Sequence, residues 1–193
     1  KKGLRGAYVI YLSLASFFFV ILGLVLYNLQ PGDVDLGNLT LKAVLFVAVY
    51  ALARGLSRSP SSLVLTMSAD ISDYEVSISG RYVAGLIGTI FSLTDSLASS
   101  FAPMMIGALL AMVGFSDVYP TAQTPLTPEL RMVAIALFAV LPLIALLIAL
   151  VFMKFYKLDS KAMEQVQIRI AELKEKGEFV DIHGDLETAD ATD

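Results

Sequence analysis

The sequence predicts an all-α membrane protein with four transmembrane helices, a cytoplasmic amphipathic helix and a disordered tail. Of its 193 residues, 56% are hydrophobic and 17% are charged, whereas soluble domains have about 25% charged residues. Four stretches reach the length of about 20 apolar residues that a helix needs to cross a bilayer. These stretches lie at about 7–29, 39–69, 82–115 and 130–155, which makes residues 1–157 the transmembrane region and 158–193 the cytoplasmic tail.

The first two predicted spans are separated by an acidic turn. Residues 7–29 contain no charged side chain, and the segment after them has a Pro-Gly pair and two Asp, which is typical of a turn. Residues 39–69 contain Arg54, Arg58 and a Ser-Pro-Ser-Ser break around Pro60. We expect one helix that is kinked at this proline, because hydroxyl groups or neighbouring helices can satisfy the backbone groups that a proline leaves free.

The third and fourth spans differ in their small and proline residues. The third contains Gly85, Gly88 and Gly107, which permit close contact between helices. Residues 116–129 have three prolines and neither Lys nor Arg, so we predict a loop. The fourth span has Pro142 near its middle.

The tail begins with an amphipathic helix over residues 160–176. Apolar residues recur there at helical spacing, at Met163, Val166, Ile170 and Leu173. We expect Asp159 or Ser160 to cap its start and Gly177 to end it. This helix is either a scaffold on the inner face or a regulatory element. Residues 178–193 are acidic and poor in apolar residues, which predicts disorder.

The positions of Lys and Arg predict the orientation. One side of the membrane receives Lys1, Lys2, Arg5, Arg81, Lys154 and Lys157, and the two opposite loops contain no Lys or Arg. Because loops rich in Lys and Arg stay on the inner side, both termini are expected in the cytoplasm. The expected location is the bacterial inner (plasma) membrane.

Four sequence blocks resemble one transporter family. They are MSADISDY at 67–74, SGRYVAG at 79–85, GALLAMVGF at 107–115 and FYKLDSKAMEQVQIRI at 155–170. Their order and spacing are similar to the C-terminal part of the glycoside-pentoside-hexuronide:cation symporters, melibiose-permease-like members of the major facilitator superfamily. The resemblance covers residues 1 to about 174. It implies that the four spans are helices nine to twelve of a twelve-helix transporter, with residues 71–81 as the loop between helices ten and eleven.

The resemblance also implies a function. It predicts part of a secondary active transporter that moves a sugar or glycoside, including an acidic one, with Na⁺ or H⁺ by alternating access. The coupling-ion site and most sugar contacts of the family lie on the N-terminal half, which would be a partner of this region. In melibiose-type permeases helix eleven has a functional lysine, and that position is Ser96 here, beside Asp95. Neither side chain supplies a fixed positive charge.

Two arginines in the second span are candidate substrate-binding residues. Arg54 and Arg58 are one turn apart and share a helix face with Tyr50. A charge at the bilayer centre costs at least about 2.5 to 3.5 kcal/mol, so both should face protein or water. They would form a bidentate clamp for an acidic sugar. Alternatively, each arginine pairs with an acid on a neighbouring helix or extends to the cytoplasmic face.

Asp95 is the acid that we expect near Arg58. Counted from the cytoplasmic ends of their spans, both lie near 20 Å along the helix at about 1.5 Å per residue. If the two spans are antiparallel neighbours, the side chains are level. They form a structural ion pair, or Asp95 binds a proton or is released from Arg58 as substrate arrives.

A cluster of charges between the second and third spans is a candidate cytoplasmic gate. It comprises Asp70, Asp73, Glu75 and Arg81. Alternating access needs an inner gate, and these charges could pair with loops of the other half. The alternative is that they are solvated and stabilise helix ends.

Other functional classes have no support in the sequence. The chain has no Cys, and its single His183 lies in the acidic tail, where we expect it to be solvated. We find no nucleophile with a base, no metal-binding cluster, no phosphate loop and no basic aromatic patch, so we predict no enzyme, no cofactor and no nucleic-acid partner. The alternatives to a sugar transporter are a stand-alone four-helix scaffold or sensor, and a lipid or drug carrier of the same superfamily.

Overall fold

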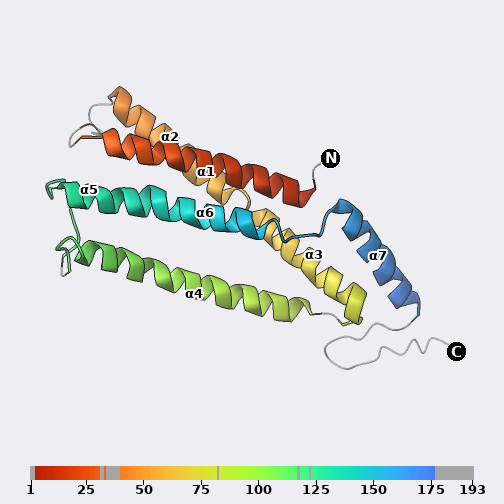
Figure 1. Cartoon of the computed structure of the whole chain (residues 1–193). Helices are drawn as coiled ribbons and strands as arrows, with labels where there is room; N and C mark the ends of the chain where they lie inside the picture. Colours follow the sequence, from red (N-terminus) through yellow and green to blue (C-terminus); the bar gives the residue numbers. More distant parts are fainter. Residues whose placement is uncertain are drawn as a thin grey trace. The chain divides into compact units, whose positions relative to one another are not determined.

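The computed structural model describes residues 3–30, 33, 40–81, 83–116, 118–121 and 123–176, and helices are its regular elements (Figure 1). This confirms the predicted all-α class for the described part. The helices are α1 (Leu4–Asn28), α2 (Leu41–Arg58), α3 (Ser61–Ser79), α4 (Ala84–Ala111), α5 (Pro128–Ile135), the π-helical turn η1 (Ala136–Val140), α6 (Leu141–Phe152) and α7 (Ser160–Glu175). The predicted tail at 178–193, with His183, and the expected helix end at Gly177 lie outside the described residues.

Three helical runs among the described residues are long and apolar enough to cross a membrane. They are α1, α4 and the continuous run of α5, η1 and α6. They match the first, third and fourth predicted spans to within a few residues, and the chain is an integral membrane protein.

The second predicted span is two helices rather than one kinked helix. Helix α2 ends at Arg58 and α3 begins at Ser61, with Ser59 and Pro60 in a turn. Pro60 has no N–H to continue the hydrogen-bond ladder. The Ser59 hydroxyl donates to the Gly55 carbonyl at 2.9 Å, so a side chain occupies one of the last acceptors of α2. Because α2 also contains Lys42 and both arginines, a membrane crossing by residues 39–69 stays a prediction.

The expected loop at 71–81 is wrong for most of its length. Helix α3 continues to Ser79 because one of its sides is buried: Ser72 is 4% exposed and Val76 2% exposed. The helix ends at Gly80, whose φ of +69° is a conformation that glycine adopts without steric cost. The turn to α4 is therefore confined to the residues after Ser79.

By its internal contacts the chain divides into two compact units. The first comprises Lys1–Tyr8, Ser61–Ser96 and Phe155–Asp193, and the second comprises Val9–Pro60 and Leu97–Lys154. In the second unit, α1, α2 and α6 lie side by side (Figure 1). Their core is built on Phe19, Leu22, Val49 and Ala53.

In the first unit, α7 packs along α3 (Figure 1). The prediction for α7 is confirmed: Asp159 caps its start by accepting hydrogen bonds from the N–H groups of Lys161 and Ala162, at 3.1 and 2.9 Å. Val166 and Leu173 are buried, as the apolar spacing predicts.

The last span has a π-helical turn that ends two residues before Pro142. The Leu141 N–H donates to the Ala136 carbonyl, five residues back, instead of four. In an α-helix Pro142 would leave the Phe138 carbonyl without a donor, and its ring would clash with that carbonyl. The wider π-turn accommodates the proline within a continuous helix.

Candidate functional site

Tyr50 and Arg54 form the centre of a cluster on α2. The Arg54 guanidinium carbon lies 5.6 Å from the centroid of the Tyr50 ring, which is a cation–π contact. Phe46, one turn earlier, stacks on Tyr50 with ring centroids 6.0 Å apart and an interplanar angle of 22°. The four-residue spacing of a helix brings these three side chains to one side of α2.

A third aromatic ring reaches Tyr50 from the last span. Phe138, in the π-turn η1, contacts the Tyr50 ring edge-to-face, with centroids 6.4 Å apart and planes at 61°. We call Phe46, Tyr50, Arg54 and Phe138 the aromatic–arginine cluster. All four residues belong to the second unit.

The two arginines have different environments. Arg54 is half-buried, and its Nε atom is buried without a hydrogen-bond partner among the described residues. Arg58 is the last residue of α2 and is exposed. The Nε–H of Arg54 is therefore a buried donor without a partner among the described residues, close to the Tyr50 ring.

Asp95 and Ser96 both lie on α4 and are both exposed. Asp95 belongs to the first unit and Arg58 to the second. The expected pairing of Arg58 with Asp95 therefore stays a prediction.

Asp70, the first residue of the predicted gate, is held by the segment between α6 and α7. The Tyr156 hydroxyl donates a hydrogen bond to Asp70 Oδ2 at 3.4 Å. Burial raises the pKa of the Asp70 carboxyl, the Tyr156 hydrogen bond opposes this, and the nearby Asp73 charge adds to it. Burial and the Asp70 charge raise the pKa of Tyr156 to about 12.

Asp73 is held by α7 itself. Its carboxylate accepts a 2.8 Å hydrogen bond from the side-chain amide of Gln167. Glu75 is half-buried on the same helix, and Arg81 is exposed two residues beyond its end. Both acids with cross-element hydrogen bonds are thus bonded to the C-terminal part of the chain, a relationship that the sequence analysis did not predict.

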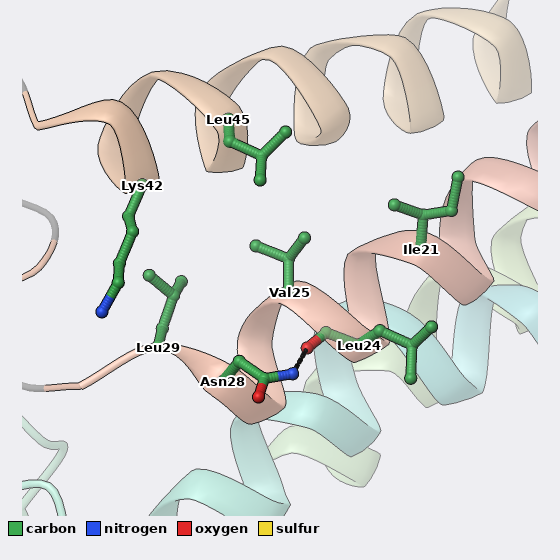
Figure 2. A pocket seen from close by; sticks show the side chains of 7 residues that line it. All are labelled: Ile21, Leu24, Val25, Asn28, Leu29, Lys42 and Leu45. Atoms are coloured by element: carbon green, nitrogen blue, oxygen red, sulfur yellow. Dashed lines mark hydrogen bonds between the residues drawn. The ribbon is translucent and has the colours of Figure 1, made fainter.

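Two hollows are lined by residues other than those of the aromatic–arginine cluster. Figure 2 shows a cavity of about 260 Å³ between α1 and α2, in which Leu45 faces Val25 across apolar walls. At one end Lys42 pairs with Asp33 at 2.9 Å, which lowers the pKa of that carboxyl. A second hollow, of about 460 Å³, lies beside Tyr156 and includes Ile71 and Lys157. No predicted site residue lines either hollow.

Sequence reasoning missed four residues of these arrangements: Phe46, Phe138, Tyr156 and Gln167. Phe46 could have been predicted from the sequence, because it precedes Tyr50 by one helical turn. Pro142 indicated an irregular helix, but not that Phe138 would reach a ring 88 positions earlier. The other two residues depend on how α7 packs on α3, which no local pattern specifies.

The comparisons with known proteins agree with the helical membrane architecture. The family described as MFS/sugar transport protein matches residues 1–160. A curated relative from Pseudescherichia vulneris, named "Uncharacterized 29.9 kDa protein in crtE 3'region", is 28% identical over 114 residues. That alignment covers 58% of this chain and 40% of the relative, so the chain corresponds to less than half of that protein. No solved structure matches the chain.

The family match confirms the resemblance inferred from the four sequence blocks, because it extends over all of the predicted transmembrane region. It points to transport rather than to an enzyme. The chain belongs to the MFS/sugar transport protein family.

Proposed function

We propose that this chain is the C-terminal region of a secondary active transporter that moves a sugar or glycoside, including an acidic one, with Na⁺ or H⁺ by alternating access. The observation that supports this most is the cation–π pair of Arg54 and Tyr50 on α2, in a chain of a sugar transport family. Substrate sites of such transporters lie near the middle of the membrane, where an unpaired arginine is otherwise costly.

The aromatic–arginine cluster has the groups that an acidic sugar needs. A sugar ring presents weakly positive C–H bonds, which suit the negative face of the Tyr50 ring. A carboxylate on that sugar would accept hydrogen bonds from the Arg54 guanidinium, whose Nε has no partner among the described residues. Arg58, one turn further, would add charge without a ring. We therefore infer that Arg54 selects the carboxylate and Tyr50 the ring.

A second region, the N-terminal half of the transporter, would complete the site and supply the coupling-ion residues. The exposure of α4 supports the proposal of partner helices, because Leu110 is the one buried residue of this helix. Small and polar residues follow one side of α4, at Gly85, Gly88, Ser92, Asp95, Ser99 and Gly107. Such a side permits close approach of another helix. Asp95 and Ser96 would then face substrate or an ion.

The charged ends of α3 and the following turn would form the cytoplasmic gate. We infer that Asp70, Asp73, Glu75 and Arg81 pair with the other half when the site faces outward. Both termini of the chain would lie in the cytoplasm of a bacterial cell, since the Lys and Arg of the loops gather on that side.

Uptake by the full-length transporter tests the substrate site. Arg54→Gln and Arg58→Gln should reduce uptake of methyl uronides much more than uptake of the matching neutral methyl glycosides, because one charged hydrogen bond is worth about 1.5–3 kcal/mol, or roughly 10- to 150-fold. Arg169→Gln is the matched control, because Arg169 lies on α7 and pairs with Glu172 at 3.0 Å. Equal loss for both sugar classes contradicts an acid clamp, and absence of uptake of either class by the parent contradicts the proposed substrate.

A further inference from the structure

Phe138 has two roles in the geometry of the last span. Its ring contacts Tyr50 edge-to-face. Its carbonyl is the one that Pro142 would leave without a donor in an α-helix, four residues back along the chain. The residue that contacts Tyr50 from the last span thus lies within the five-residue segment in which the helix departs from α geometry.

The π-turn is seated closely against α1. Ala139, the residue after Phe138, is 2% exposed. A Cβ atom placed on Gly23 of α1 would lie 3.5 Å from the Cβ atom of Ala139, an ordinary van der Waals contact, so the space between the two residues is about one methyl group. With one side of the turn against α1, Phe138 is directed to Tyr50 on α2. The ring contact with Phe138 is thus the route by which a change in the turn would reach the Tyr50 ring.

We propose that Phe138 is a positioning residue: the Pro142 π-turn sets its ring, and its ring sets Tyr50 and thereby Arg54 for the sugar. The proposal rests on the proposed function of Tyr50 and Arg54, and it adds a specificity determinant from the last span. The Tyr50 ring is held by Phe46 on one side, by Phe138 edge-on and by the Arg54 cation. If the Phe138 ring is removed, the Tyr50 ring can change its tilt, although neither Tyr50 nor Arg54 has been substituted.

The test is sugar uptake by the full-length transporter with Phe138→Ala, Phe138→Leu and Phe138→Tyr. Both variants without a ring should raise KM by about two- to tenfold, the value of one aromatic pair, while the maximal rate per folded molecule changes little. Phe138→Tyr keeps the ring and should restore the parent KM. Phe152→Ala is the matched control on α6, since Phe152 is 67% exposed. A purely structural role would reduce protein amount and maximal rate together and leave KM unchanged.

The outcomes separate this inference from the proposed function. If Arg54→Gln impairs uptake but Phe138→Leu has the KM of Phe152→Ala, the positioning role is wrong and the substrate site stands. If Tyr50→Leu and Arg54→Gln both leave KM unchanged, the proposed site is wrong, and the inference fails with it. If Phe138→Ala does not accumulate in the membrane, Phe138→Leu decides, because it preserves most of the side-chain volume.

Discussion

The side-chain amide of Gln167 on α7 donates a 2.8 Å hydrogen bond to the Asp73 carboxylate on α3. Together with the hydrogen bond from the Tyr156 hydroxyl to Asp70, it connects two of the predicted gate acids to α7 and to the segment that precedes it. Helix α7 is thus connected to α3 by polar contacts as well as by the buried Val166 and Leu173.

Loss of the Gln167 amide should loosen α7. We expect Gln167→Leu to lower the free energy of docking of α7 on α3 by about 0.5–1.5 kcal/mol, the net value of one hydrogen bond. Amide hydrogen exchange of α7 in the membrane-embedded protein measures this as faster exchange. Gln165→Leu, an exposed neighbour on the same helix, is the control and should exchange like the parent. Equal exchange in both variants would show that the hydrogen bond contributes nothing.

Stability should depend on pH through Asp70. Its pKa is raised above the ordinary value of 3.8, mainly by burial, so the folded protein binds a proton that the unfolded chain releases. The contribution of Asp70 to the free energy of unfolding therefore increases as the pH falls through the raised pKa, and it reaches its full value below the ordinary pKa. It is lost again as the pH rises.

Thermal unfolding of the parent and of Asp70→Asn measures this dependence. Because the amide mimics the protonated acid, the difference in unfolding temperature between the two proteins should shrink from about pH 7 to about pH 4. A constant difference over this range would mean that Asp70 does not titrate as inferred.

A buried hydroxyl predicts a stabilising substitution. Ser72 is 4% exposed, and its Oγ atom has no hydrogen-bond partner among the described residues. An unsatisfied buried polar group costs about 1–3 kcal/mol, so Ser72→Ala should raise the unfolding temperature. Ser77→Ala is the control, because the Ser77 hydroxyl donates to the Tyr74 carbonyl at 2.7 Å and gains nothing by removal. A lower unfolding temperature for Ser72→Ala would indicate that the hydroxyl has a partner.

The cap of α7 should be worth about 1 kcal/mol. Asp159→Ala removes the acceptor of two backbone N–H groups at the first turn. Asp159→Asn retains an acceptor oxygen and should keep most of the stability. Circular dichroism of the membrane protein during thermal unfolding compares the two, and equal losses would contradict a capping role.

The sequence predicted what local patterns determine. Hydropathy located three spans, and apolar spacing with Asp159 located α7. The helical spacing of Tyr50 and Arg54 placed them on one side of α2. At Pro60 the sequence predicted a kink, whereas α2 ends there. The hydroxyl groups of Ser57 and Ser59 donate to the Arg54 and Gly55 carbonyls near the end of α2. The helix through residues 71–79 was missed because the family resemblance implied a loop there, and the burial of one side of this helix depends on contacts that the sequence does not show, such as those with α7.

The contacts of Phe138 and Gln167 could not be read from the sequence. Each joins residues that are far apart in the chain, 88 positions in one case and 94 in the other. Such pairs depend on how whole helices pack. The periodicity of a sequence indicates only which side of a helix is apolar. The position of Asp95 relative to Arg58 likewise depends on how helices pack, so the sequence alone does not determine it.

The most direct test of a substrate site on α2 is protection of a neighbouring cysteine by sugar. The chain has no Cys, so Ala51→Cys, exposed and one turn before Arg54, gives it a single thiol in a transporter freed of other cysteines. Methyl uronides should slow labelling of this thiol by a water-soluble maleimide severalfold. They should not slow labelling of Leu52→Cys, an exposed position two residues from both Tyr50 and Arg54 and therefore on the opposite side of α2. Equal labelling rates of Ala51→Cys with and without every uronide and neutral glycoside would contradict the site.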